Sequence, residues 1–156
     1  MPGLREAPPI QAASWFNVTD PPTLEALRGR VVVLYAFQML CPGCHQHATP
    51  QTQRVHESFS RKDVAVIGLH SVFEDHEAQS PERLAAYLRD ERLTFPVAVD
   101  APAADNDIPL TMQALQLDGT PTTLLLDRQG RIRLKRFGYL TDLELGAAIG
   151  RLLAEN

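Results

Sequence analysis

The chain has 156 residues, of which 44% are hydrophobic and 22% are charged, and its formal net charge is −4 at pH 7. This length favours a single domain whose folding would bury roughly 70% of the surface of the unfolded chain. Acidic and basic residues are interspersed without a basic stripe, which excludes nucleic acid as an expected partner, and no run approaches the ~18 apolar residues of a membrane span.

The N-terminus predicts an irregular lead-in over residues 1–14, and residues 15–156 are expected to form the single domain. Prolines disfavour regular structure in the lead-in, and Arg5 has no apolar stretch behind it, unlike the start of a signal peptide. We therefore expect a cytoplasmic protein from the sequence as written, and a periplasmic one if a leader has been removed. A monomer is expected.

The first elements surround a buried strand. Residues 15–18 predict a short strand and residues 23–27 a single helical turn. Residues 31–37 form a continuous apolar run rich in β-branched side chains, which is typical of a strand buried on both faces of a parallel sheet. A helix is predicted from Pro42 to about residue 60, with a kink at Pro50, because proline removes one backbone hydrogen bond.

Strands and helices then alternate towards a closing hairpin. Alternation of this kind predicts a parallel sheet with covering helices, and a hairpin near the end makes the sheet mixed. The expected fold class is therefore α/β, with a mixed central sheet, helices on both faces, a closing β-hairpin and a C-terminal helix. The remaining predicted elements are strands at 64–69, 95–99, 122–126 and 132–137, and helices capped at Ser80, spanning 108–115 and capped at Thr141.

The only two cysteines, Cys41 and Cys44, stand at the start of the predicted helix. Two cysteines so close in sequence build no structural disulfide framework, so their thiols are expected to serve chemistry. A helix N-terminus carries about half a positive charge, which favours a thiolate at Cys41. Cys41 would attack a substrate disulfide, and Cys44, one turn along, would resolve the mixed disulfide.

A zinc site is the alternative interpretation of the cysteine pair. Structural zinc needs four ligands, often from two such pairs, whereas this chain has one. His45 and His47 could supply the other two ligands, but side chains two apart on a helix point in different directions. The redox interpretation is therefore favoured.

Two separated segments carry a family resemblance. Residues 31–50, VVVLYAFQMLCPGCHQHATP, with residues 24–30 before them, resemble the active-site block of the TlpA-like thioredoxin-fold proteins. Residues 119–123 are similar to the cis-proline loop of that family, and the resemblance extends over nearly the whole chain. Residues 15–17 and 68–71 also resemble thioredoxin-like domains that precede NHL repeats. The resemblance implies a thioredoxin-like fold and a thiol–disulfide oxidoreductase.

The resemblance also assigns roles around the dithiol. It implies that Pro121 is cis and faces the cysteines, and that the backbone of Thr120 pairs with an extended substrate segment. An edge-strand or turn proline is the alternative for Pro121.

The residues beside the cysteines complete the expected site. Pro42 and Gly43 separate the two cysteines and would tune the reduction potential. Met39 and Leu40 would form an apolar lip on which substrate rests, although packing at the helix start is the alternative for both.

Three family positions differ in this chain. The family usually has tryptophan where this chain has Leu40, and often glutamate where it has His47; thioredoxin keeps a buried acid where this chain has Tyr35. The usual carboxylate proton acceptor is therefore missing at both places. An imidazole exchanges protons near its unperturbed pKa of about 6.5. We hypothesise that His47 assists deprotonation of Cys44, with a solvated surface histidine as the alternative.

Two further groups could approach the site. His70 follows a predicted strand at the edge where active sites of such sheets lie, although a histidine bonded to backbone is the favoured interpretation. Residues 74–77, Glu-Asp-His-Glu, could form a weak metal site, although a solvated loop is favoured.

No bound cofactor is expected, because the two cysteines carry the electrons. The expected partners are a protein or small-molecule disulfide and a reductase or oxidase that recycles the dithiol. Two alternative functions stay open. Peroxiredoxins keep a hydroxyl residue and a proline where this chain has Gln38 and Leu34. A copper or haem-maturation thiol chaperone could hold Cu(I) on the thiols, although copper-delivering proteins of this fold have three residues between their cysteines and this chain has two.

Overall fold

The central strands of the sheet come from the most apolar runs of the sequence. The computed structural model of the protein describes residues 4–155, and within them a six-stranded sheet has the order β1-β4-β3-β2-β5-β6. Every residue of the central strand β2 is buried, as its apolar sequence predicts. The strands are β1 (Ala12–Phe16), β2 (Val31–Phe37), β3 (Val64–His70), β4 (Val97–Asp100), β5 (Thr122–Leu126) and β6 (Ile132–Phe137).

The sheet is mixed, as predicted. Strand β2 pairs in parallel with β3, and β3 pairs in parallel with β4. The edge strand β1 and the hairpin strands β5 and β6 are antiparallel to their neighbours. Phe37 lies opposite His70 in the β2–β3 register, so both strands end at the same edge of the sheet. The cysteines follow β2 at this edge.

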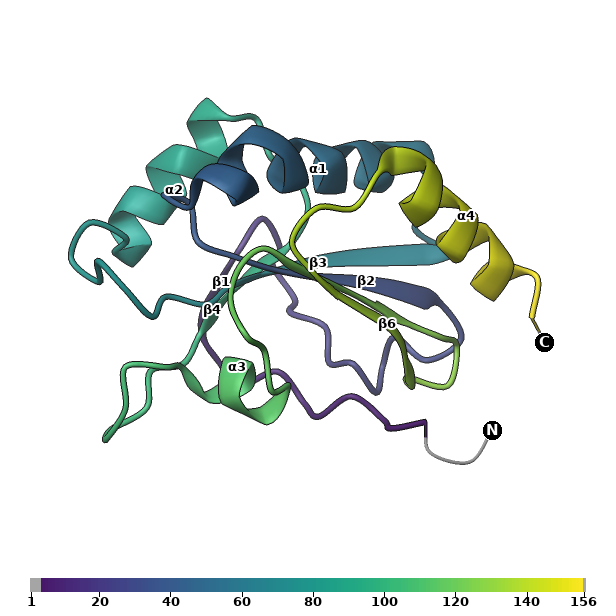
Figure 1. Ribbon diagram of the computed structural model, residues 1–156, viewed down its shortest axis with the longest axis horizontal. Helices are drawn as coiled ribbons and strands as arrows, with labels where there is room; N and C mark the ends of the chain where they lie inside the picture. The colour runs from purple at the N-terminus through teal and green to yellow at the C-terminus, as the bar shows by residue number, and fades with distance from the viewer. Residues whose placement is uncertain (1–3, 156) are drawn as a thin grey trace.

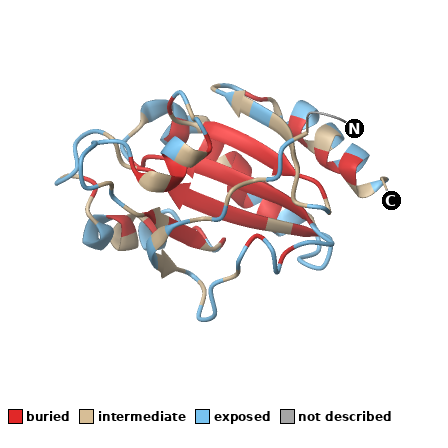
Figure 2. Ribbon diagram, turned by 90° about the horizontal axis from the view of Figure 1, so that it is seen from below, coloured by how far each residue is buried: buried red, intermediate tan, exposed pale blue. Residues whose placement is uncertain are grey.

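Helices cover both faces of the sheet unequally (Figure 1). Helices α1 (Thr49–Ser58), α2 (Pro81–Asp90) and α4 (Asp142–Leu153) pack on one face. The short helix α3 (Leu110–Ala114) lies on the opposite face, where residues of the N-terminal segment also pack. Figure 2, seen from that second side, shows the central strands as the most buried part of the molecule. None of the helices in residues 4–155 is long and apolar enough to cross a membrane.

The edge strands differ from their predicted limits. Strand β1 begins at Ala12, inside the expected lead-in, and β4 spans Val97–Asp100 instead of 95–99. Their pairing sets these limits, because Ala12 lies opposite Asp100 and Phe16 lies opposite Val97. The lead-in also contacts the closing hairpin, where the Ala7 N–H donates to the Gly130 carbonyl at 2.9 Å.

The helix after the cysteines contains a π-helical turn, η1 (Cys44–Ala48), before α1 begins. The Thr49 N–H donates to the Cys44 carbonyl, so the bond joins residues that are further apart in sequence than those joined in an α-helix. Pro50 falls in the first turn of α1, where its missing N–H needs no helical partner. A π turn therefore stands just before Pro50, the residue at which the sequence predicted a kink.

The predicted helix caps are confirmed. The Ser80 hydroxyl accepts from the Arg83 N–H at the start of α2. Thr141 and Glu144 form the predicted capping box at the start of α4. The last strand pair and α4 therefore follow the sequence closely, and they hold the loop that carries Pro121.

Candidate active site

The two thiols lie at the carboxyl edge of β2 with different exposure. Cys41 is half-buried, Cys44 is completely buried, and neither is in a disulfide. The Cys41 thiol donates to the Thr120 carbonyl with an Sγ···O distance of 3.5 Å. The His45 N–H donates to the Cys41 carbonyl at 2.9 Å, so Cys41 caps the helical segment. Cys41 is therefore the more accessible of the two thiols.

The loop before β5 faces the cysteines. The Thr120–Pro121 peptide bond is cis. A Cβ placed on Gly43 would lie 3.5 Å from Pro121 Cδ, an ordinary van der Waals contact. The structure therefore brings Cys41, Gly43, Thr120 and Pro121 together from two segments far apart in the sequence.

A buried glutamine, Gln38, joins the loops around the cysteines. Its Nε2 donates to Glu74 Oε1 at 3.1 Å and to Thr120 Oγ1 at 3.3 Å. Its Oε1 accepts from the Phe73 N–H at 3.2 Å and from Gln79 Nε2 at 3.1 Å. The sequence alone did not predict Gln38 as part of the site. The available signal was a polar residue directly after a fully apolar strand.

Cys44 is held in its protonated form. Burial, together with the hydrogen bond to the Cys41 thiol, raises the pKa of the Cys44 thiol to about 12. Tyr35, which occupies the position of the acid in thioredoxin, is also fully buried, and its hydroxyl lies beside Cys44. Burial and the neighbouring Cys44 raise the pKa of the Tyr35 hydroxyl well above its usual value. The Tyr35 hydroxyl beside Cys44 is therefore neutral at pH 7, as the Cys44 thiol is.

The two histidines beside Cys44 bond to different elements. His47 Nε2 hydrogen-bonds to the Leu140 carbonyl at 2.9 Å, and its ring packs on Tyr139 with centroids 4.5 Å apart. Within residues 4–155, no hydrogen bond joins His47 to Cys44. His45 is exposed, and its Nδ1 lies 2.9 Å from the Tyr87 hydroxyl on α2.

His70 is buried at the end of β3 and contacts the backbone before the cysteines. Its Nε2 accepts from the Met39 N–H at 3.1 Å, and burial lowers the pKa of His70 to about 4. The backbone-bonded interpretation is therefore confirmed, with the correction that His70 belongs to the strand itself. In the described part of the chain, no group of three or more His, Cys, Asp or Glu side chains is placed to hold a metal ion.

A cleft of about 390 Å³ opens beside Cys41. Leu40 is 53% exposed on one wall and Phe137, at the end of β6, is 55% exposed on the other. Met39 is buried, so the predicted lip consists of Leu40 without Met39. Phe137 was missed because its position beside Gly119 depends on the packing of the hairpin against the loop before β5.

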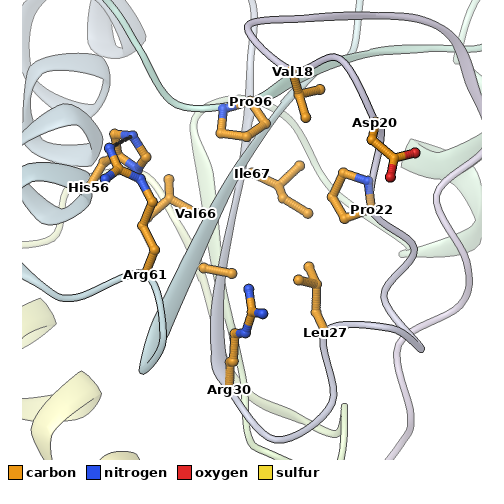
Figure 3. A pocket seen from close by; sticks show the side chains of 11 residues that line it. Val18, Asp20, Pro22, Leu27, Arg30, His56, Arg61, Val66, Ile67 and Pro96 are labelled. Atoms are coloured by element: carbon orange, nitrogen blue, oxygen red, sulfur yellow. Dashed lines mark hydrogen bonds between the residues drawn. The ribbon is translucent and has the colours of Figure 1, made fainter.

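A second pocket, of about 190 Å³, lies away from this cleft (Figure 3). Its apolar wall includes Ile67 and Leu27, and Arg30, Arg61 and His56 stand at its rim. It adjoins the start of β2, whereas the cysteines follow the end of that strand. We therefore assign the chemistry to the cleft beside Cys41.

Comparisons with known protein sequences identify the family of the chain. The model of the AhpC/TSA family matches residues 5–135. The thioredoxin-like protein SkfH of Bacillus subtilis (strain 168) is 31% identical over 107 residues, which cover 69% of this chain and 68% of SkfH. NHL repeat-containing protein 2 of Homo sapiens is 28% identical over 130 residues, which cover 82% of this chain but only 17% of that protein.

Solved structures extend the agreement to the fold. The crystal structure of the thioredoxin-like superfamily protein SPOA0173 superposes with a TM-score of 0.94, at 49% identity and 97% coverage of both chains. A thiol-disulfide isomerase from Corynebacterium glutamicum superposes with a TM-score of 0.91, at 45% identity, covering 96% of this chain and 98% of that one. The thioredoxin-like fold and the predicted resemblance, including its NHL-repeat branch, are confirmed.

Proposed function

Because the chain belongs to the AhpC/TSA family, we propose that it is a thiol–disulfide oxidoreductase that exchanges electrons with protein or small-molecule disulfides through Cys41 and Cys44. The observation that carries this proposal is the arrangement of the two thiols. A half-buried Cys41 borders an open cleft and contacts the Thr120 carbonyl, while Cys44 is buried behind it. This arrangement suits one attacking and one resolving thiol.

The first step is attack by Cys41. Its thiolate donates an electron pair to one sulfur of the substrate disulfide, and the substrate S–S bond breaks. The other substrate sulfur leaves as a thiolate and takes a proton from solvent. A mixed disulfide then joins Cys41 to the substrate.

The second step closes the internal disulfide. Cys44 loses its proton and attacks Cys41 Sγ, the mixed disulfide breaks, and the remaining substrate thiolate leaves and is protonated. The substrate has gained two electrons and two protons, and the protein holds a Cys41–Cys44 disulfide. A partner reductase restores the dithiol. If the partner is an oxidase, the same steps run in reverse.

Substrate would bind in the cleft beside Cys41. We propose that an extended segment pairs with the backbone of Thr120, as an added strand would, and that Leu40 and Phe137 contact its apolar side chains. Pro42 and Gly43 lie between the thiols at the start of the helical segment and would lie next to the bound segment. No cofactor enters this scheme, and the protein is proposed to act as a monomer.

A peroxidase is less well supported. The peroxiredoxin alternative calls for a hydroxyl at position 38, where this protein has an amide already engaged in four hydrogen bonds. A thiol chaperone for copper is an alternative that metal analysis tests. Stoichiometric Cu(I) retained by the reduced protein against a competing chelator would favour the chaperone over the oxidoreductase.

The proposal is tested by trapping partners on Cys41. The Cys44→Ser variant should accumulate mixed disulfides with host proteins, because the resolving thiol is gone, and a reductant should release them for identification. The matched control is the Cys41→Ser/Cys44→Ser double variant, which should trap none. Absence of trapped partners, together with a wild-type protein that cannot reduce insulin, would overturn the proposal.

A further inference from the structure

Three side-chain hydroxyls lie between the buried Cys44 thiol and the molecular surface. The Tyr35 hydroxyl lies beside Cys44 and is 2.7 Å from Thr49 Oγ1. The Tyr87 hydroxyl also lies near Thr49, whose side chain acts to lower the pKa of Tyr87. The exposed His45 then approaches the Tyr87 hydroxyl, with Nδ1 at 2.9 Å.

This row is built from separate elements of the fold. Tyr35 comes from β2, Thr49 begins α1, and Tyr87 comes from α2. The stacking of Tyr35 on Phe37, with centroids 5.0 Å apart and planes within 4°, fixes the first hydroxyl. His45 and Cys44 are neighbours in η1, so the two ends of the row are held by one π-helical turn.

Attack by Cys44 in the resolving step needs an acceptor for the Cys44 proton. Cys44 is fully buried and protonated, and its attack releases a proton inside the protein. The buried acid that thioredoxin keeps for this purpose is replaced by Tyr35. A tyrosine hydroxyl both donates and accepts, so it can pass a proton along without holding a charge. Burial raises the pKa of Tyr87 to about 12, so this hydroxyl also stays neutral at pH 7.

We propose that Tyr35, Thr49 and Tyr87 form a proton relay that carries the Cys44 proton to His45 during resolution of the mixed disulfide. This inference rests on the function proposed above and names the residues that replace the missing acid. His45 is the terminal acceptor because its ring reaches both Tyr87 and solvent.

Atoms and charge balance in this proton transfer. The Cys44 proton moves to Tyr35, the Tyr35 proton to Thr49, the Thr49 proton to Tyr87 and the Tyr87 proton to His45 Nδ1. The Cys44 electron pair forms the bond to Cys41 Sγ, and the substrate thiolate leaves with the pair of the broken bond. His45 then returns a proton to water, and the substrate thiolate takes one up.

The relay differs from the earlier hypothesis for His47. His47 bonds to the Leu140 carbonyl and packs on Tyr139, which ties it to the loop before α4. Within the described residues, no side-chain hydrogen bond joins His47 to Tyr35, Thr49 or Tyr87. The two hypotheses therefore make different predictions for the same reaction.

The experiment separates the two thiol attacks in a single turnover. Reduced protein is mixed with one equivalent of an aromatic disulfide whose thiolate is coloured. The first release of colour reports attack by Cys41, and the second reports attack by Cys44. We expect Tyr35→Phe to slow the second release on the order of 100-fold, the usual contribution of proton transfer, with the first release unchanged. Tyr139→Phe, on an exposed tyrosine outside the row, is the matched control and should behave as wild type.

Chemical rescue separates a relay from a structural role. His45→Ala should also slow the second release, and added imidazole should restore it, because His45 is exposed and a base from solvent can take its place. A wild-type second release in Tyr35→Phe, or a loss in His45→Ala that imidazole does not restore, would overturn the relay. Slowing in His47→Ala but not in Tyr35→Phe would overturn it in favour of His47. Failure of the first release as well would instead count against the proposed function.

Discussion

At the scale of single residues, the site depends on buried polar groups whose partners come from distant segments. Gln38 joins two loops to the strand end, and His70 accepts from the Met39 N–H just before the cysteines. Each such group must find a partner, because an unpaired buried polar group costs about 1–3 kcal/mol. These contacts hold the approach to Cys41 in one geometry.

His70 makes the stability of the protein depend on pH. Its pKa is lowered to about 4 by burial, from 6.5 in the unfolded chain. Between these values the unfolded state binds a proton that the folded state does not, so the free energy of unfolding falls as pH falls through this window. A shift of this size corresponds to about 3 kcal/mol, an order-of-magnitude figure.

We therefore expect His70→Gln to flatten the stability profile between pH 6.5 and about 4, measured by urea unfolding at several pH values. Glutamine can still accept from the Met39 N–H but does not titrate. Carboxylates contribute equally to both proteins, so the difference between the two profiles isolates His70. Parallel profiles would contradict this account of the buried imidazole.

The candidate site residues could be predicted from the sequence more readily than the residues that pack around them. Cys41 and Gly43 lie beside Thr120 and Pro121, as the two separated sequence motifs predicted. Gln38 and Phe137 were not predicted, since nothing local shows that an amide or a ring will meet a loop that lies far along the chain. The row from Tyr35 to His45 was missed for the same reason.

At the scale of elements, the apolar pattern of the sequence predicted the limits of several strands, whereas strand pairing determined the limits of β1 and β4. The strands β2, β5 and β6 have the predicted limits, because all three follow continuous local signals. The limits of β1 and β4 depend on each other and could not be read from either segment alone. The π turn η1 was not predicted, and it lies directly before the proline at which a kink was expected.

Replacing a glycine by alanine is expected to change the stability in opposite directions in β3 and in α4. In β3, a Cβ on Gly68 would lie 2.7 Å from Phe95 Cε1 and 3.2 Å from Phe37 Cε1, both in the core. We expect Gly68→Ala to lower the free energy of unfolding by about 1–3 kcal/mol through overpacking. In α4, a Cβ on Gly146 would meet nothing within 4 Å, so Gly146→Ala should raise the free energy by up to about 1 kcal/mol through helix propensity.

Urea unfolding of both variants against wild type measures this contrast. Since each change adds a single methyl group, the side-chain chemistry is matched and only the surroundings differ. A Gly68→Ala protein as stable as wild type would mean that the two rings can move aside, and the described packing of β3 would be wrong.

At the scale of the whole molecule, the candidate site lies at one edge of the sheet, where β2 ends. Three helices cover one face, the short α3 and the N-terminal segment lie on the other, and the cysteines emerge where β2 ends. The fold class, the mixed sheet and the closing hairpin were all predicted. The unequal distribution of the helices was not, because local sequence does not say which face a helix will cover.

The central claim is that Cys41 and Cys44 exchange electrons with a disulfide as a pair. The most direct measurement mixes reduced protein with one equivalent of a peptide disulfide and follows intact mass and released thiols together. We predict that the wild-type protein loses two hydrogen atoms, forms a Cys41–Cys44 disulfide and releases both peptide thiols, whereas the Cys41→Ser variant does none of these. A wild-type protein that stays reduced, or one that reacts equally well without Cys41, would contradict the account.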